Sequence, residues 1–183
     1  VSYQGDLRLG GLGRLASMQV LTGAVDYDGE RATLRDRRAG TTVLASRNNV
    51  GVTLQYQAVS SRVSLVAGVR AEDNASFGTV GVPRVSVAGL LHRGAGLLGG
   101  TKLKFNAGLG VKEPTILQSF SPNAFFLGNP NLLAERARTI DFGVEQRLAG
   151  DRAKVDVVWF DNRYRNQIAT ETTNFTTFAA QYF

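Results

Sequence analysis

Apolar and polar residues alternate in several segments of the chain. From position 52 to position 58, apolar Val52, Leu54, Tyr56 and Ala58 are separated by polar Thr53, Gln55 and Gln57. Successive side chains of a β-strand point to opposite faces, so this pattern predicts a strand with one apolar face and one polar face. The same alternation recurs at 63 to 70, 102 to 112, 140 to 145 and 154 to 159.

Weaker alternation at about 2 to 9, 16 to 28 and 82 to 92 brings the number of predicted strands to eight. Short connections are expected near 10 to 15, 59 to 61, 93 to 99 and 149 to 150, and long ones at 29 to 47, 72 to 81 and 113 to 135. Short and long connections therefore alternate, as they do at the two rims of an up-and-down transmembrane barrel.

The expected strands are about 10 to 13 residues long, whereas a strand of a soluble globular protein usually has about 5 to 6. A tilted strand that crosses a membrane needs roughly 9 to 11 residues. The sequence thus predicts an all-β fold, an antiparallel up-and-down meander of about eight long strands that forms part of a large transmembrane β-barrel.

The net charge of +6 raises the question of a nucleic-acid partner. Arg35, Arg37 and Arg38 form the one tight basic group, beside Asp36 in a turn-rich stretch, which is typical of a solvated loop. Fifteen carboxylates are interleaved with the basic residues, and no nucleic-acid recognition motif accompanies them. We therefore expect no nucleic acid among the partners.

The chain has no cysteine and a single histidine, His92. It therefore lacks the residues for a Ser/His/Asp relay or for a histidine- or cysteine-based metal cluster. No apolar run approaches the roughly 18 residues of a membrane-spanning helix. We expect a protein that is not an enzyme, uses no cofactor or metal, and does not cross a membrane with helices.

Two motifs follow one another in the second half of the chain. The first is the run GLGVKEPTILQSF from Gly108 to Phe120, and the second is the GNPNL sequence from Gly128 to Leu132. With further short motifs from about residue 62 to residue 170, their order and spacing resemble the barrel of TonB-dependent receptors. The chain departs from that pattern at Glu113, where the family usually has a small residue, and at Leu133-Ala134, which replaces a common Lys-Pro.

The resemblance implies a receptor of the bacterial outer membrane that imports a scarce nutrient, such as a siderophore or cobalamin, by energy-coupled uptake. It implies a 22-stranded barrel closed by a plug domain. Nothing in the chain resembles the plug, so residues 1 to 183 are expected to be a partial barrel domain. The implied partners are outer-membrane lipid, the nutrient complex, and TonB through the plug.

Three groups of residues are candidates for functional contacts. Loop residues Phe120, Asn123, Phe125 and Phe126 are candidates for contact with a ligand, with packing inside the loop as the alternative. Charged Lys104, Asp141, Glu145 and Asp156 are expected to face the barrel lumen, where they contact the plug, line a transport path or simply face water. Tyr56, Trp159 and Tyr164 are expected in the aromatic belt at the membrane interface, with sugar stacking as the alternative.

Two other functions are compatible with the same alternation. A small eight-stranded outer-membrane barrel with a structural or adhesive role requires that the first and last strands pair. A soluble carbohydrate-binding β-protein requires that the apolar strand faces pack against a second sheet.

Overall fold

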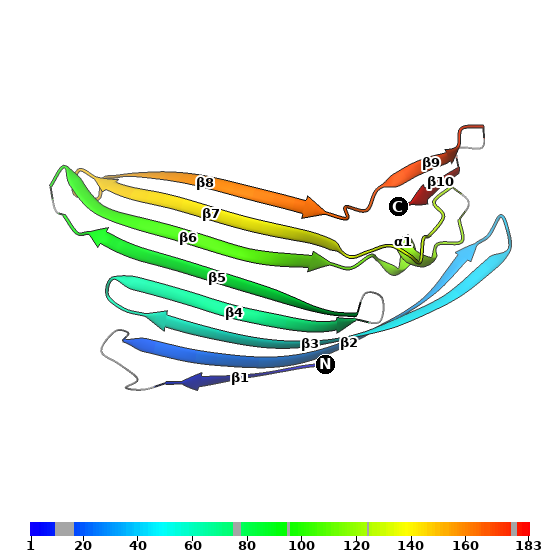
Figure 1. Cartoon of the computed structure of the whole chain (residues 1–183), viewed down its shortest axis with the longest axis horizontal. Coiled ribbons are helices and arrows are strands. Elements are labelled where there is room, and N and C mark those ends of the chain that lie inside the picture. Colours follow the sequence, from blue (N-terminus) through cyan, green and yellow to red (C-terminus); the bar gives the residue numbers. More distant parts are fainter. Residues whose placement is uncertain (10–16, 75–77, 95, 124, 177–178) are drawn as a thin grey trace.

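The computed structural model of the chain describes all residues except 10–16, 75–77, 95, 124, 177 and 178. Eight strands form one sheet, in the order of the sequence (Figure 1). They are β1 (Ser2–Arg8), β2 (Met18–Asp36), β3 (Thr41–Val59), β4 (Val63–Asn74), β5 (Gly78–His92), β6 (Leu98–Lys112), β7 (Glu135–Leu148) and β8 (Ala153–Arg165). Every neighbouring pair is antiparallel, so the predicted all-β meander of eight strands is confirmed.

Two of the three long connections expected from the sequence are wrong. Strands β2 and β3 pair without interruption up to Asp36 opposite Thr41, so most of the expected loop at 29 to 47 is strand and only 37 to 40 form the turn. The expected loop at 72 to 81 is also mostly strand, because β4 continues to Asn74 and β5 begins at Gly78. The basic group at 35 to 38 is typical of a solvated loop, but solvated side chains are also compatible with a strand that pairs through its backbone.

The third long connection, from 113 to 134, contains the short helix α1 (Ile116–Phe120). A second sheet of β9 (Thr170–Asn174) and β10 (Ala179–Tyr182) lies at the same end of the molecule. Figure 1 shows that the β2–β3 hairpin extends past the other strands toward this end. Among the described residues, no helix has the length and apolar composition to cross a membrane.

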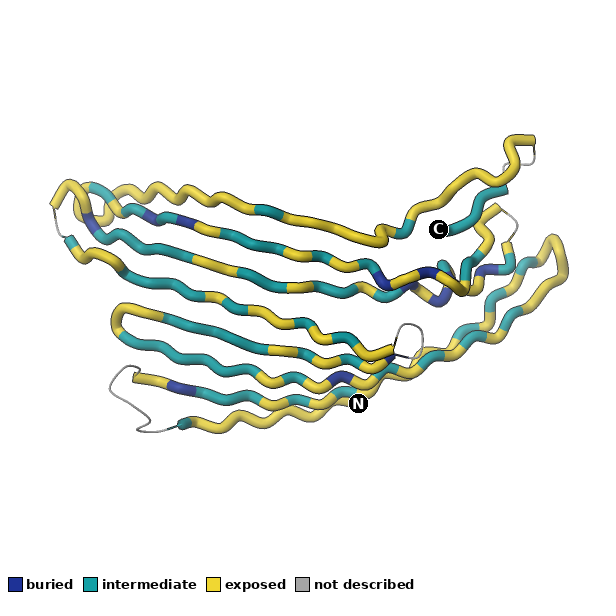
Figure 2. Tube along the Cα trace, in the orientation of Figure 1, coloured by how far each residue is buried: buried dark blue, intermediate teal, exposed yellow. Residues whose placement is uncertain are grey.

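The apolar face of the large sheet is open. Leu54, Phe105, Phe142 and Val157 are 52, 39, 43 and 64% exposed, and Figure 2 shows exposed residues along every strand. This face therefore packs against no second sheet in the part of the chain that the structure describes, contrary to the requirement for a soluble sandwich. Strands β1 and β8 form the two edges of the sheet and do not pair with each other, contrary to the requirement for a small closed barrel.

Candidate functional site

A capping box starts α1 in the long loop. The Thr115 hydroxyl accepts a hydrogen bond from the Gln118 backbone N–H at 3.2 Å, and the Gln118 side-chain oxygen accepts one from the Thr115 N–H at 2.8 Å. These bonds satisfy backbone donors that the first turn of a helix leaves without partners. The Thr-Ile-Leu-Gln sequence thus fixes where the loop turns after β6.

Gly128 closes the loop onto α1. Its backbone N–H donates to the Ser121 carbonyl at 2.9 Å, and the next N–H, of Asn129, donates to the Gln118 carbonyl at 2.9 Å. A Cβ atom at position 128 would lie 2.6 Å from the Phe120 backbone nitrogen, too close for any side chain. The GNP motif of the sequence is therefore a structural closure, in which glycine permits the close approach.

Asn123 orients the aromatic part of the loop. Its side-chain oxygen accepts a hydrogen bond from the Phe125 N–H at 2.9 Å, and its carbonyl accepts one from the Phe126 N–H at 3.0 Å. This local turn is the usual role of asparagine in loops. Both phenylalanines remain partly exposed, at 41 and 52%. They lie against the tip of the β2–β3 hairpin.

The tip of the hairpin is a turn held by Asp36. The Asp36 carboxylate accepts hydrogen bonds from the backbone N–H groups of Arg38 and Ala39, at 2.8 and 3.2 Å, and Gly40 follows with a φ of 67°. The Arg38 guanidinium carbon lies 5.6 Å from the centre of the Phe125 ring, within the range of a cation–π contact. The turn and the aromatic loop thus meet through these two side chains.

A cavity of about 500 Å³ lies between the turn and the loop. It is lined by Arg35, Asp36, Arg37, Arg38, Asn123, Phe125 and Phe126. A neighbouring cavity of about 370 Å³ shares Arg35, Asn123 and Phe126 with it. Three arginines outnumber the one aspartate, whose carboxylate is already engaged in the turn, so the first cavity favours an anionic ligand. We call this first space the Arg-Phe cavity.

Three of the four loop candidates, Asn123, Phe125 and Phe126, line the Arg-Phe cavity, and the fourth does not. Phe120 is the last residue of α1 and borders neither hollow. Sequence reasoning assigned Arg35, Arg37 and Arg38 to an isolated solvated loop and missed their place in the site. No local sequence signal joins them to Phe125, because the contact forms only when β2 and β3 pair beyond the rest of the sheet.

A cluster of polar groups ties the long loop to the hairpin. The Arg47 guanidinium lies 2.5 Å from the Glu30 carboxylate and 3.2 Å from that of Glu113, and it also donates to the Pro114 carbonyl. Asn74 on β4 donates to the other oxygen of Glu113. The Arg47 side chain is only 9% exposed. We call these five residues the Arg47 anchor. Glu113, which departs from the family pattern, therefore connects the loop to Arg47 on β3 and to Asn74 on β4.

The structure brings together three of the four charged residues expected in the lumen. The Lys104 ammonium lies 2.8 Å from the Glu145 carboxylate and 2.5 Å from that of Asp156. These residues come from β6, β7 and β8, on the face opposite to the exposed apolar side chains. Asp141 shares that face but is outside the cluster, and Arg147 approaches Glu145 at 3.6 Å. Lys104 on β6 therefore forms ion pairs with both β7 and β8.

Replacing Lys104 with methionine is expected to lower the resistance of the eight-stranded sheet to unfolding by urea. Glu145 and Asp156 stand directly opposite each other on β7 and β8, so without the ammonium two carboxylates would repel across the strand pair. The measurement is urea unfolding followed by tryptophan fluorescence. Lys102→Met removes a positive charge from the same face of β6, directly opposite Glu145, without breaking an ion pair among the described residues, and is the control for a general loss of charge near the cluster. Equal unfolding midpoints for both variants would contradict this role.

The three aromatic residues expected at the membrane interface do not share a face. Tyr56 and Trp159 lie on the apolar face, where Trp159 is opposite Phe142 and the Tyr56 hydroxyl donates to Gln19 at 2.7 Å. Tyr164 is five positions after Trp159 and therefore lies on the polar face, opposite Ala137. The pairing separates Tyr164 from any belt formed by the other two.

At the loop end of β7, Glu135 fixes the segment that follows β8. Its carboxylate lies 2.9 Å from the Lys112 ammonium and accepts a hydrogen bond from the Ile168 N–H at 2.8 Å. Glu135 lies beyond the apolar band of the sheet. The hydrogen bond from Lys112, and then that from Ile168, hold the pKa of Glu135 below its ordinary value, so the carboxylate stays ionised.

Comparison with known proteins gives consistent matches. The family model described as TonB dependent receptor-like, beta-barrel matches residues 1–183. The siderophore receptor PirA from Pseudomonas aeruginosa is 22% identical, with a TM-score of 0.74 over 99% of this chain and 32% of its own. The ferric enterobactin receptor PfeA of the same species, as a Q482A mutant in complex with enterobactin, is 18% identical, with a TM-score of 0.73 over 93% of this chain and 27% of its own.

The RagAB peptide importer is also similar, at 12% identity and a TM-score of 0.67 over 99% of this chain and 25% of its own. The chain thus spans about a third or less of the length of these proteins.

Proposed function

Because the chain belongs to the family of TonB-dependent receptor β-barrels, we propose that it forms barrel wall and ligand-binding surface in a receptor that takes up an anionic, aromatic iron–siderophore complex. The family consists of transport receptors of the bacterial outer membrane and is not a family of enzymes. In this proposal the end that carries the long loop and the hairpin tip is extracellular, and the short turns lie at the periplasmic rim.

The Arg-Phe cavity is the observation that carries the proposal. Its volume of about 500 Å³ falls in the range of small-molecule sites, roughly 300 to 1,000 Å³. The arginines offer fixed, planar donors to anionic oxygens, while Phe125 and Phe126 offer ring faces to an aromatic ligand. The three arginines are exposed to water, and a neutral ligand would displace part of this water without offering the charge-assisted hydrogen bonds that an anionic ligand provides. The cavity therefore fits an anionic siderophore better than cobalamin.

Energy coupling through TonB is part of the same proposal. The inner face of the sheet carries Asp141 and the cluster around Lys104, where a plug domain would sit. Lys104, Glu145 and Asp156 already compensate one another. Asp141 has no ion-pair partner in the described part of the chain, so it is the residue of this group that is best placed to bind a plug or to line the path.

The test is equilibrium binding to the purified full-length receptor that contains this chain. The ligands are an anionic ferric tris-catecholate, a neutral ferric hydroxamate, cobalamin and an oligopeptide. Replacing Arg35 and Arg38 together with serine is expected to weaken binding of the tris-catecholate by about tenfold per arginine, because each removes charge-assisted hydrogen bonds. Arg31→Ser removes an exposed arginine lower on the same strand and is expected to leave affinity unchanged.

Three results would contradict the proposal. One is unchanged tris-catecholate affinity in the double variant. Another is an equal loss in Arg31→Ser, which would show a general effect of charge. The third is tighter binding of the neutral hydroxamate, cobalamin or peptide than of the tris-catecholate, which would assign the receptor to a different nutrient.

A further inference from the structure

Four arginines gather on the outward, apolar face of the sheet, near the end that carries the long loop. Strand β7 contributes Arg136 and Arg138, and β8 contributes Arg163 and Arg165. Pairing places Arg136 directly opposite Arg165 and Arg138 directly opposite Arg163. All four side chains are exposed. Like charges directly opposite one another in a sheet are unfavourable unless an anion lies between them.

The described residues place little negative charge beside these four arginines. Asp161 lies 3.0 Å from Arg163. Arg136, Arg138 and Arg165 form no ion pair or hydrogen bond through their side chains with any other residue that the structure describes. Three positive charges are therefore held close together without a counter-charge, which is the arrangement of an anion-binding site.

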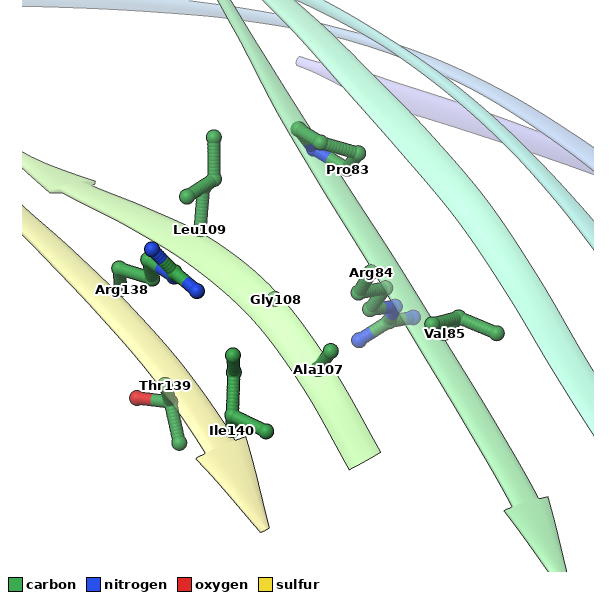
Figure 3. Close-up of a pocket in the computed structure, with 9 residues that line it drawn as sticks. All are labelled: Pro83, Arg84, Val85, Ala107, Gly108, Leu109, Arg138, Thr139 and Ile140. Carbon is green, nitrogen blue, oxygen red and sulfur yellow. The ribbon is translucent and has the colours of Figure 1, made fainter. Parts of the chain in front are cut away.

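Two adjoining hollows beside the four arginines form a surface that is positively charged at one end and apolar at the other. One, of about 290 Å³, is lined by the four arginines together with Leu109 and Val111. The other, of about 280 Å³, begins at Leu109 and Arg138 and continues over apolar Pro83, Val85, Ala107 and Ile140. Figure 3 shows Leu109 on β6 beside Arg138 and Ile140 on β7. The hollow lined by the four arginines thus continues into an apolar groove.

The position of the four arginines along β7 and β8 indicates which kind of molecule occupies the two hollows. From Arg138 toward the short turns, the same face continues with Ile140, Phe142 and Val144, which are the side chains that lipid contacts in an outer-membrane barrel. The arginines therefore stand where the apolar band ends and the head groups of the outer leaflet begin. Arginine at such a boundary pairs with lipid phosphate through bidentate hydrogen bonds.

We propose that Arg136, Arg138, Arg163 and Arg165 bind the phosphate groups of a phosphorylated lipid of the outer leaflet, whose acyl chain lies in the groove between Val85 and Ile140. The site is on the outer surface of the barrel, away from the Arg-Phe cavity. It rests on the outer-membrane location of the family and on the extracellular position of the long loop in the proposed function, and not on the identity of the imported nutrient. Failure of the siderophore assignment and failure of the lipid site are therefore distinguishable results.

The test is native mass spectrometry of the detergent-solubilised full-length receptor, titrated with bisphosphorylated lipid A. The wild type is expected to retain this lipid, and the variant with Arg136→Ser and Arg138→Ser to bind it about tenfold more weakly per arginine. The control variant carries Arg62→Ser and Arg152→Ser, two exposed arginines in the turns at the opposite rim. Its affinity for lipid A is expected to match the wild type.

Further arms identify the source of the phosphate. Dephosphorylated lipid A is expected to bind weakly to all variants, and inorganic phosphate at the same concentration is expected not to displace the phosphorylated lipid. Arg136→Lys with Arg138→Lys keeps the charge and is expected to restore part of the binding. Equal binding of dephosphorylated lipid would overturn the proposal, as would displacement by free phosphate or equal losses in the control variant. Circular dichroism confirms that each variant is folded.

Discussion

Replacing Arg47 with alanine is expected to release the loop from 113 to 134 from the β2–β3 hairpin. Arg47 is nearly buried and touches two carboxylates and a carbonyl, so its loss leaves Glu30 and Glu113 close together without a positive charge. The Arg47 side chain is 9% exposed and its carboxylate partners are 45 and 27% exposed, so the loss of its two ion pairs and one hydrogen bond together is expected to cost about 3 kcal/mol. This is equivalent to roughly a 100-fold increase in the population of the open loop.

Hydrogen exchange followed by mass spectrometry measures this opening in the full-length receptor. Amide protection from 113 to 134 is expected to fall by about 100-fold, with no change in the strands β4 to β6. Arg31→Ala on the same hairpin has no ion pair to break in the described part of the chain, and is expected to leave the loop protected. Arg47→Lys keeps the charge but loses the bidentate geometry, so an intermediate loss is expected. Full protection in Arg47→Ala would show that the Arg47 anchor does not hold the loop.

Gly128→Ala is expected to have an effect of similar size by a different route. The new Cβ would lie 2.6 Å from the Phe120 nitrogen, and this backbone atom cannot move without breaking the turn that ends α1. The steric clash and the loss of two backbone hydrogen bonds are expected to destabilise the closed loop by about 3 kcal/mol. If the proposed function holds, affinity for the ferric tris-catecholate then falls with the population of closed loops.

The barrel itself is expected to be unaffected by Gly128→Ala, since no strand pair involves this residue. Thermal unfolding of the sheet, followed by circular dichroism, therefore separates a local effect from general instability. Gly23→Ala is the matched control, because a Cβ at position 23 meets no atom within 4 Å. If Gly128→Ala keeps both loop protection and ligand affinity, the closure of the loop does not depend on this glycine.

The sheet could be predicted from the sequence because its main signal is local. Alternation such as that from 52 to 58 depends only on neighbouring residues, and each strand buries backbone polar groups against the next in order. The long hairpin does not follow from the sequence, because the basic group of Arg35, Arg37 and Arg38 is typical of a solvated loop. In the structure Glu30 lies directly opposite Arg47 and forms an ion pair with it, so this pair of charges stabilises the pairing of β2 with β3.

The candidate site was predicted only in part. Asn123, Phe125 and Phe126 follow from the composition of a long loop, but their partner Arg38 lies in the distant turn between β2 and β3, and no local pattern connects the two segments. Tyr164 shows a second limit, because residue type indicated an interface aromatic while the parity of the strand determines which face it occupies. The contacts of the candidate site therefore depend on the register of the strands, and this register is determined by the pairing of the whole sheet and not by any local segment.

Strands β2 and β3 pair without interruption, so the number of residue pairs in the hairpin determines the face of the sheet toward which its tip is turned. Deleting one residue from each arm below Asp36 would rotate everything above the deletion to the opposite side, and the arginines of the turn would face away from Phe125. Deleting two from each arm would lower the turn but keep its orientation. With uninterrupted pairing, the reach of this hairpin can therefore change without turning its tip only in steps of two residue pairs.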